Sequence, residues 1–334
     1  MKNKKVLVTL ANESYLDQAK QLFSSAYFNA GWDGDFLLLA HEVPEEKLQW
    51  FKDKGILIKK CQAIPCERFN GKWPPVVLSK FYIFTPEFKQ WDNVIFLDAD
   101  IIVRASLENI DQVKGLHAVT GHRHFSSLWL NKIHLFLEKI NYSPLTELKH
   151  QLDFTDKSFN TGVLAFSTDI IQNNTFESLI KLSNKFFALS ASGEEAILNV
   201  YFYKQWQELS SFYNTYPDCL IPEAGLKPEE VQGAILHFII NKPWLKKNPF
   251  YNEWSKNLTI SNKIGTELPK TKNFTTEEIK DILSDIEIRQ NKRLHIKFFN
   301  KFYQETDRLI GLVGLSLKRI SPHSYHLLKK LKNN

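Results

Sequence analysis

The chain has 334 residues, of which 43% are hydrophobic, so it can bury a substantial core and is not disordered as a whole. Its three cysteines, Cys61, Cys66 and Cys219, are too few for a disulfide framework, and they predict a reducing compartment in which they serve as small buried hydrophobes. The net charge of +6 is unevenly divided, because residues 289–334 carry 11 Lys or Arg against 2 acids, which leaves 32 against 35 for residues 1–288.

The first part of the chain alternates apolar runs of strand length with helical patterns. Leu16, Ala19 and Leu22 follow the 3.6-residue period of a helix, and Pro44 and Gly55 are typical of the start and end of the next one. This βαβ alternation predicts a parallel, doubly wound sheet. The predicted strands are 6–10, 36–40, 56–58 and 93–97, and the predicted helices are 15–30, 44–54 and a short one at 75–84.

The pattern continues less regularly to about residue 239 and then changes. We predict strands at 118–120, 162–166 and 234–239, and helices at 169–187 and 194–203. From about Thr275 the chain is helical and increasingly basic, with an apolar cluster formed by Leu309, Ile310, Leu312, Val313, Leu315 and Leu317. We therefore expect an α/β body of residues 1–265, with a mostly parallel sheet flanked by helices, and a basic amphipathic helical extension of residues 266–334.

Two aspartates follow the most apolar predicted strand. Asp98 and Asp100 come directly after residues 93–97, and ligands of open α/β sheets collect beyond the carboxyl ends of such strands. Two carboxylates there can hold Mn²⁺ or Mg²⁺ shared with a substrate phosphate. Asp33 and Asp35 have the same spacing but precede their strand, so we interpret them as part of a turn.

Four segments together resemble the family 8 glycosyltransferases, retaining enzymes of the GT-A fold that include glycogenin and lipopolysaccharide galactosyl- and glucosyltransferases. The segments span residues 6–244 in the family's order, and the C-terminal tail lies outside the resemblance. They are Val8–Tyr15, Phe96–Asp100, Phe159–Val163, and His237-Phe238 followed by Lys242-Pro243-Trp244.

The resemblance implies a cation site and a donor site. Asp98, Asp100 and His237 would hold Mn²⁺, with Mg²⁺ as the alternative, although a histidine inside an apolar run is on its own more often a core residue. Lys242 would contact the diphosphate of a UDP-sugar and stabilise the leaving group, or be a solvated loop lysine. The remaining residues expected at the donor are Leu10, Asn12 and Tyr15 around uracil and ribose, Lys80, Ala99 and Gly162.

The resemblance also implies the groups that face the sugar. Asn160 matches an amide that binds sugar hydroxyls, although Asn-Thr-Gly is also typical of a plain turn. Glu194 and Glu195 stand where the family usually has Asp-Gln, so Glu195 is a candidate nucleophile. Ser192 and Glu195 alternatively form an S-x-x-E capping box.

These residues predict a retaining transferase that moves glucose or galactose from UDP to a glycan or glycolipid acceptor, with attack on the same face or through a brief adduct with Glu195. Two departures keep alternatives open. A glycogenin-like or other protein-modifying glucosyltransferase is one alternative, and it is weakened because Ala191 stands where glycogenin-like enzymes have an acid near the acceptor. Ile240 replaces a glycine that permits close backbone approach. A nucleotide-sugar-binding protein without transferase activity is the alternative of another class. A nucleotidyltransferase is disfavoured, since no glycine-rich phosphate loop lies near residues 10–15.

The acceptor and the location are predicted from the ends of the chain. The apolar stretch after the basic N-terminus is only residues 6–11, too short for an export signal, and no window approaches the ~20 apolar residues that span a bilayer. We therefore expect a cytoplasmic protein. The basic tail, with Phe298, Phe299, Phe302 and Tyr303, predicts peripheral binding to an anionic inner membrane face. Such binding would suit a role in lipopolysaccharide or surface-glycan synthesis. The alternative is that the tail packs on the body, and nucleic acid binding is disfavoured.

Overall fold

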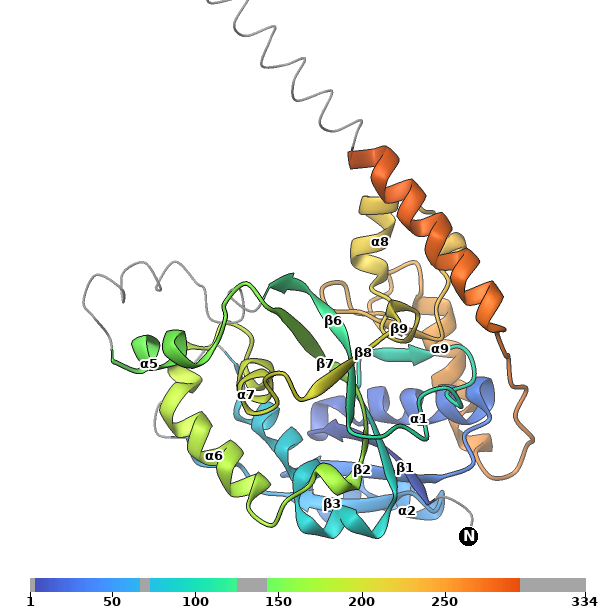
Figure 1. Cartoon of the computed structure of the whole chain (residues 1–334). Coiled ribbons are helices and arrows are strands. Elements are labelled where there is room, and N and C mark those ends of the chain that lie inside the picture. The colour runs from blue at the N-terminus through green and yellow to red at the C-terminus, as the bar shows by residue number, and fades with distance from the viewer. Residues whose placement is uncertain (1–3, 67–72, 125–142, 295–334) are drawn as a thin grey trace, which may run out of the picture.

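The computed structural model describes residues 4–66, 73–124 and 143–294 (Figure 1). Its centre is a seven-stranded sheet with the strand order β3-β2-β1-β4-β7-β6-β8, and a second sheet pairs β5 with β9. The strands are β1 Lys5–Ala11, β2 Asp35–His41, β3 Leu57–Cys61, β4 Asn93–Leu97, β5 Ile101–Val103, β6 Leu116–His124, β7 Lys157–Ser167, β8 Trp206–Leu209 and β9 Ile235–His237.

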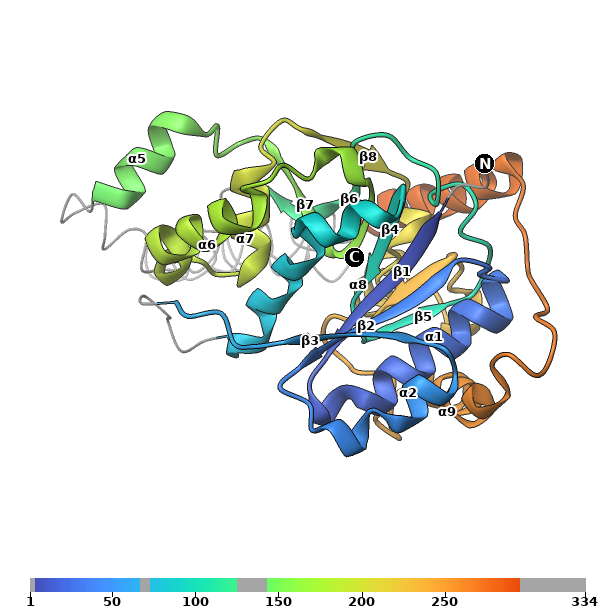
Figure 2. The ribbon, with the colours of Figure 1, turned by 90° about the horizontal axis from the view of Figure 1, so that it is seen from below.

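Helices cover both faces of the main sheet. Figure 2 shows α1, α2 and α9 on one side and α6 and α7 on the other. The α-helices are α1 Leu16–Ala30, α2 Gln49–Asp53, α5 Ser143–Gln151, α6 Thr175–Phe186, α7 Glu194–Tyr201, α8 Pro217–Ala224 and α9 Tyr251–Ile260, and residues 276–294 form a further helix. A 3-10 helix, Pro75–Phe84, stands where a short helix is predicted, and Thr85 ends it.

The central strands are mostly apolar because both of their faces are buried. Val8 and Phe96 belong to the core cluster that includes α6 and α7, whereas Leu7 and Ile95 belong to the cluster that includes α1. Continuous apolar runs are typical of parallel strands covered on both faces. The strands β1 to β4 are parallel neighbours, as predicted, and β7 runs antiparallel to β4 and β6.

Several predicted boundaries were wrong for local reasons. Residues 157–161 were expected before a strand, but they extend β7 because Lys157 and Phe159 pair with β6. Helix 44–54 begins as a 3-10 turn and becomes α-helical only at Gln49; Gly55, with φ +69°, ends it as expected. Helix 169–187 is shortened because residues 168–170 form a 3-10 turn and α6 starts at Thr175.

The small sheet was not predicted, and it positions the site. Strand β5 starts one residue after Asp100, and its Ile101 pairs with His237 at the end of β9. Segments 136 residues apart in the sequence are thus held side by side by backbone hydrogen bonds. The predicted closing strand 234–239 is only Ile235–His237 and lies outside the main sheet.

The helix of residues 276–294 lies beside α8 (Figure 1). Arg289 pairs with Glu230, and Gln290 Nε2 donates a hydrogen bond to Glu223. Among the described residues, no helix combines the length and the apolar character that crossing a membrane requires. The apolar cluster of residues 309–317 and the aromatic residues 298–303 lie outside the described residues, so the expected division at residue 265 and the tail's membrane role stay predictions.

Candidate active site

The two aspartates after β4 converge with His237 at the carboxyl edge of the sheet. One ligand atom from each of Asp98, Asp100 and His237 lies within 4.8 Å of the others. His237 Nε2 is 3.3 Å from Asp100 Oδ1 and 4.0 Å from Asp98 Oδ2. The fold therefore gathers two carboxylates and an imidazole, a ligand set suited to Mn²⁺ and, less well, to Mg²⁺.

Each aspartate uses one carboxylate oxygen for a lysine and turns the other toward His237. Lys80 Nζ is 3.1 Å from Asp98 Oδ1, and Lys242 Nζ is 2.5 Å from Asp100 Oδ2. Asp100 Oδ1 is buried and has no hydrogen-bond partner among the described residues. An orphaned buried carboxylate oxygen is costly, and a divalent cation would satisfy it, so these residues fit the ion.

The charge state of Asp100 agrees with a ligand role. Burial raises the pKa of its carboxyl, but the His237 imidazole and the Lys242 ammonium outweigh burial and hold the pKa well below its usual range. The carboxylate is therefore ionised at neutral pH, as a metal ligand must be.

Lys80 is buried beneath the aspartates and is only 3% exposed. Its ammonium donates to Glu194 Oε1 at 2.6 Å and to the carbonyl and hydroxyl oxygens of Thr161 at 3.2 Å. Although burial lowers its pKa, Asp98 and Glu194 together raise the pKa above its usual value. Lys80 and Glu194 thus form a buried ion pair that supports Asp98, and contact of Lys80 with a donor stays a prediction.

Glu195 points toward β7 and does not cap its helix. Asn160 Nδ2 donates to Glu195 Oε2 at 2.7 Å, and the Thr161 amide donates to the same oxygen at 3.2 Å. The N-cap of α7 is Gly193, with φ +63°, so the alternative of a capping box from Ser192 was wrong. Burial and the neighbouring Glu194 raise the pKa of Glu195 to about 7, against the opposing effects of Thr161, Lys80 and Asn160.

Tyr216 is a buried residue beside His237. Its ring lies beside the His237 ring, with centroids 5.5 Å apart. Burial raises the pKa of Tyr216 well above its usual value, and the charges of Glu195, Asp98 and Asp100 raise it further. Tyr216 thus contacts His237 and Asn214 and lies within electrostatic range of Glu195 and the two aspartates.

A statistical profile of the family described as Glycosyl transferase family 8 matches residues 6–248, most of the chain. The chain belongs to glycosyl transferase family 8. Among relatives of this family 8 chain, Glycosyltransferase GlyA of Streptococcus pneumoniae serotype 4 is 25% identical over 260 residues. The match covers 72% of this chain and 32% of GlyA, so the chain spans about a third of the length of that relative.

Solved structures resemble the family 8 chain in fold. The apo-form glycosyltransferase GlyE of Streptococcus pneumoniae TIGR4 has a TM-score of 0.54 at 20% identity, covering 78% of this chain and 62% of GlyE. The galactosyltransferase LgtC, in complex with donor and acceptor sugar analogs, has a TM-score of 0.54 at 16% identity, covering 79% of this chain and 98% of LgtC. The predicted GT-A fold is confirmed.

Gly162 of this family 8 chain leaves room for His237. A Cβ built on Gly162 would lie 2.2 Å from His237 Cε1 and 2.8 Å from its Nδ1. The resemblance attributes the glycine to close passage of the donor, whereas the structure gives a requirement within the protein itself. The alternative of a plain turn at Asn160-Thr161-Gly162 was wrong, because all three residues lie in strand β7.

We expect Gly162→Ala to weaken Mn²⁺ binding at least tenfold, since the new methyl group displaces the imidazole from the aspartates. Isothermal titration with Mn²⁺ measures the change. Gly121→Ala, on β6, is the matched control, because its Cβ would meet atoms no closer than 3.5 Å. An alanine at 162 that binds Mn²⁺ like the wild type would contradict the prediction.

The residues expected around the nucleotide lie at the end of β1. Asn12 lines a cavity of about 430 Å³ with Ser14 and His41, and it accepts a hydrogen bond from the Ser14 hydroxyl at 2.8 Å. Leu10 is half-buried, and the exposed Tyr15 packs its ring edge against Trp244 at 5.7 Å. Ala99 is buried between the two aspartates.

The loop after His237 keeps Ile240 away from the aspartates. The Ile240 side chain is 66% exposed, and its amide and that of Asn241 donate to Asp218 Oδ2. Lys242 reaches back over this loop, donating to the carbonyl of Phe238 at 2.7 Å as well as to Asp100.

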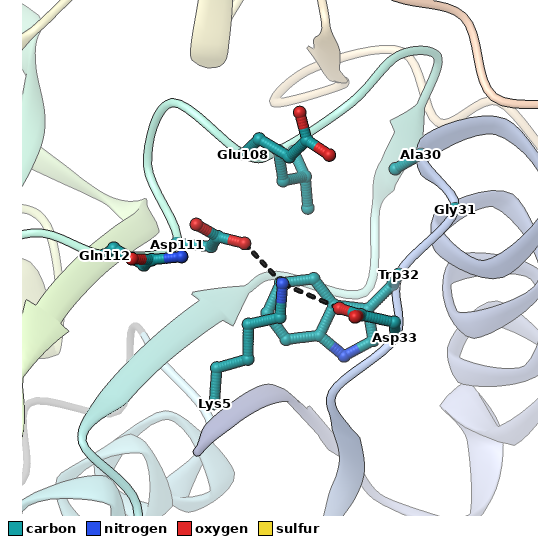
Figure 3. A pocket seen from close by; sticks show the side chains of 9 residues that line it. Lys5, Ala30, Gly31, Trp32, Asp33, Glu108, Asp111 and Gln112 are labelled. Carbon is teal, nitrogen blue, oxygen red and sulfur yellow. Dashed lines mark hydrogen bonds and ion pairs between the residues drawn. The ribbon is translucent and has the colours of Figure 1, made fainter. Parts of the chain in front are cut away.

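A second cavity, of about 490 Å³, lies at the opposite edge of the sheet (Figure 3). Lys5 there pairs with Asp33 and Asp111, and Trp91 Nε1 donates to Asp35. Both carboxylates thus serve internal contacts far from β4's carboxyl end. Asp33 precedes β2 as predicted, but the predicted turn does not include Asp35, which is the first residue of that strand.

Asn214 and Tyr216 are the site residues that the sequence did not indicate. Asn214 is fully buried and lies within hydrogen-bond distance of His237, Asn160 and Tyr216. A lone asparagine between Tyr213 and Thr215 has no pattern of its own, so only the folded arrangement identifies it.

Proposed function

We propose that the chain transfers a hexose, glucose or galactose, from a UDP-sugar to a glycan or glycolipid acceptor with retention of anomeric configuration. The observation that carries the proposal is the convergence of Asp98, Asp100 and His237 beside the hydrogen-bonded carboxylate of Glu195. This arrangement supplies a cation site for a diphosphate and a carboxylate for the sugar at one sheet edge.

Asp98, Asp100 and His237 would hold a divalent cation, with Mn²⁺ preferred because imidazole suits it better than Mg²⁺. When bound, the cation supplies positive charge against the diphosphate of the leaving UDP. The protein contributes the geometry, since Lys80 and Lys242 each hold one oxygen of an aspartate and leave the other oxygen for the ion.

Lys242 has a further role in this proposal. Its ammonium is part-exposed beside Asp100, so it adds positive charge where charge develops on the leaving group. The cavity near Asn12 supports binding of the uridine, and it lies beyond the end of β1, the edge that also carries Asp98. Leu10 and Tyr15 do not line this cavity, and their contact with the nucleotide is proposed from the family resemblance alone.

Glu195 faces the sugar in this proposal. As a nucleophile, its carboxylate would form a bond to the anomeric carbon while the bond to UDP breaks, and the acceptor oxygen would then displace Glu195 to restore the configuration. In the alternative route the acceptor attacks on the same face as UDP leaves, and Glu195 only stabilises the positive sugar. Asn160 donates to Oε2 and orients the carboxylate in either route.

A donor-panel hydrolysis assay tests the proposal. UDP release from UDP-glucose, UDP-galactose and other UDP-hexoses is measured with Mn²⁺, with Mg²⁺ and with chelator. We expect cation-dependent release from one hexose above the rest. Tight UDP binding without turnover of any donor would instead favour the nucleotide-sugar-binding alternative, and incorporation of sugar into the chain itself would favour the glycogenin-like one.

The surroundings of the site favour a glycolipid acceptor, as in surface-glycan or lipopolysaccharide synthesis at the inner membrane face. Three aliphatic side chains near Lys242 are exposed, Ile239 at 38%, Ile240 at 66% and Leu245 at 42%. Lys246 and Lys247 beside them are also exposed. Aliphatic and cationic side chains together suit the interface of an anionic bilayer, where each lysine adds about 1 kcal/mol of binding free energy.

We expect the full chain to co-sediment with vesicles of phosphatidylcholine and phosphatidylglycerol in a salt-sensitive manner. The triple variant Ile239→Ser, Ile240→Ser, Leu245→Ser should bind at least about tenfold more weakly, since removing about 1.4 kcal/mol of apolar transfer free energy has this effect. The control is Leu57→Ser with Leu268→Ser, two exposed leucines elsewhere. Equal vesicle binding by the triple variant and the wild type would contradict this.

A further inference from the structure

A continuous chain of side-chain hydrogen bonds joins His237 to Glu195. His237 Nδ1 is 2.9 Å from Asn214 Oδ1, Asn214 Nδ2 is 2.9 Å from Asn160 Oδ1, and Asn160 Nδ2 is 2.7 Å from Glu195 Oε2. Two amides thus connect a candidate metal ligand with the candidate nucleophile, and one of them, Asn214, has no role in the function proposed above.

The direction of every bond in this chain follows from one backbone amide. The N–H of Gly162 donates to Asn160 Oδ1 at 3.0 Å, so this atom of Asn160 is an acceptor. Its second neighbour must therefore be the donor Nδ2 of Asn214, which turns Asn214 Oδ1 toward His237. A carbonyl oxygen only accepts, so His237 carries a proton on Nδ1.

Burial prevents other arrangements of these groups. Asn214 is 0% exposed and His237 is 3% exposed, so water has little access to either. The hydroxyl of Tyr216 accepts a second hydrogen bond from Asn214 Nδ2 at 2.8 Å. Turning the Asn214 amide over would place its Oδ1 against Asn160 Oδ1, which already accepts from the Gly162 amide, so two acceptor oxygens would face each other at about 1–3 kcal/mol for the buried group left unsatisfied.

We propose that Asn214 is a positioning residue with two roles. Its carbonyl fixes the Nδ1–H tautomer of His237, which leaves the lone pair of Nε2 facing Asp98 and Asp100, where a cation would bind. Its amide group holds Asn160 with Nδ2 toward Glu195. The first role rests on the cation site of the proposed function. The proton on His237 Nδ1 does not depend on that site, because it follows from the hydrogen bonds alone.

Two substitutions separate the roles. Asn214→Asp keeps an oxygen that accepts from His237 Nδ1–H but removes the N–H donated to Asn160, whereas Asn214→Leu removes both. We expect Asn214→Leu to weaken Mn²⁺ binding by about 10- to 100-fold, the usual effect of losing the partner of a metal-bound histidine. Asn214→Asp should keep Mn²⁺ affinity within about threefold and lower kcat with little change in KM for the donor, because Glu195 loses its orientation.

Mn²⁺ affinity is measured from the electron paramagnetic resonance signal of free Mn²⁺, and the tautomer from long-range ¹H–¹⁵N spectra of the metal-free chain. We expect Nδ1 of the wild-type His237 to carry a proton, with or without a second proton on Nε2 beside the aspartates, and Asn214→Leu to lose this preference. Asn93→Leu is the matched control for loss of a buried asparagine, since Asn93 is 6% exposed and lies at the opposite end of β4. Its Mn²⁺ affinity should equal that of the wild type.

A wild-type spectrum in which His237 Nδ1 carries no proton overturns the proposal, and it does so even when Asn214→Leu does not fold. Wild-type Mn²⁺ affinity in a folded Asn214→Leu chain overturns it as well. A different result would contradict the proposed function alone. In that case the wild-type chain binds no Mn²⁺, although His237 Nδ1 carries its proton.

Discussion

Asp100→Asn is expected to lower cation-dependent sugar transfer about 1,000-fold or more while the chain stays folded. The amide removes the charge of the carboxylate whose Oδ1 has no partner among the described residues, and it leaves Lys242 beside a neutral group. Loss of a bound cation removes several kcal/mol of transition-state stabilisation, and about 4 kcal/mol corresponds to a factor of about 1,000 in rate.

The chain contains its own control for this prediction. Asp33 belongs to the Asp-x-Asp sequence at the opposite edge, and its side chain is 52% exposed and paired with Lys5. Asp33→Asn should keep wild-type UDP release and Mn²⁺ affinity. The measurements are UDP release with and without Mn²⁺, Mn²⁺ titration, and thermal unfolding to confirm the fold. Metal-dependent transfer that persists in Asp100→Asn would refute the assignment of this carboxylate.

The strands β1, β2 and β4 were predictable because burial on both faces makes most of their residues apolar, whereas the longer β6 and β7 were predicted only as 118–120 and 162–166. Each of these three strands contains an apolar run, and the predicted bounds differ from the observed ones by at most one residue at each end. The strands β5 and β8 were not predicted, because three and four residues form no recognisable period. Their existence depends on partners that only the tertiary fold supplies.

The site was predictable in part for a similar reason. Asp98 and Asp100 were assigned from their place after a buried strand, and the structure gathers them with His237. The roles of Gly162 and Asn214 could not be predicted, because they depend on contacts between segments far apart in the sequence. A Cβ on Gly162 would clash with His237, and the Asn214 amide lies between the side chains of His237 and Asn160. The alternative of a capping box from Ser192 and Glu195 was wrong, because the Glu195 carboxylate accepts hydrogen bonds from Asn160 and Thr161 instead.

Glu195→Gln is expected to lower kcat at least about 100-fold and to remove a pH dependence that the wild type shows. Burial and Glu194 raise the pKa of Glu195 to about 7, and the ionised form is the one that can attack or stabilise the sugar. Activity should therefore rise as the pH increases through the folded pKa. A bound divalent cation adds nearby positive charge, which lowers the pKa of Glu195, so the rise in activity is expected at pH 7 or below.

The comparison that checks this prediction is the pH profile of kcat for the wild type and Glu195→Gln, at saturating donor and Mn²⁺. The glutamine variant should be slow and lack the ascending limb. Glu195→Ala with added azide then distinguishes the two routes, because an azide ion in the space left by a nucleophile displaces UDP from the opposite face. The nucleophilic route predicts a glycosyl azide of inverted configuration, whereas attack on the same face as UDP leaves predicts no rescue. An unchanged ascending limb in Glu195→Gln would show that another group titrates, and that Glu195 does not carry the reaction.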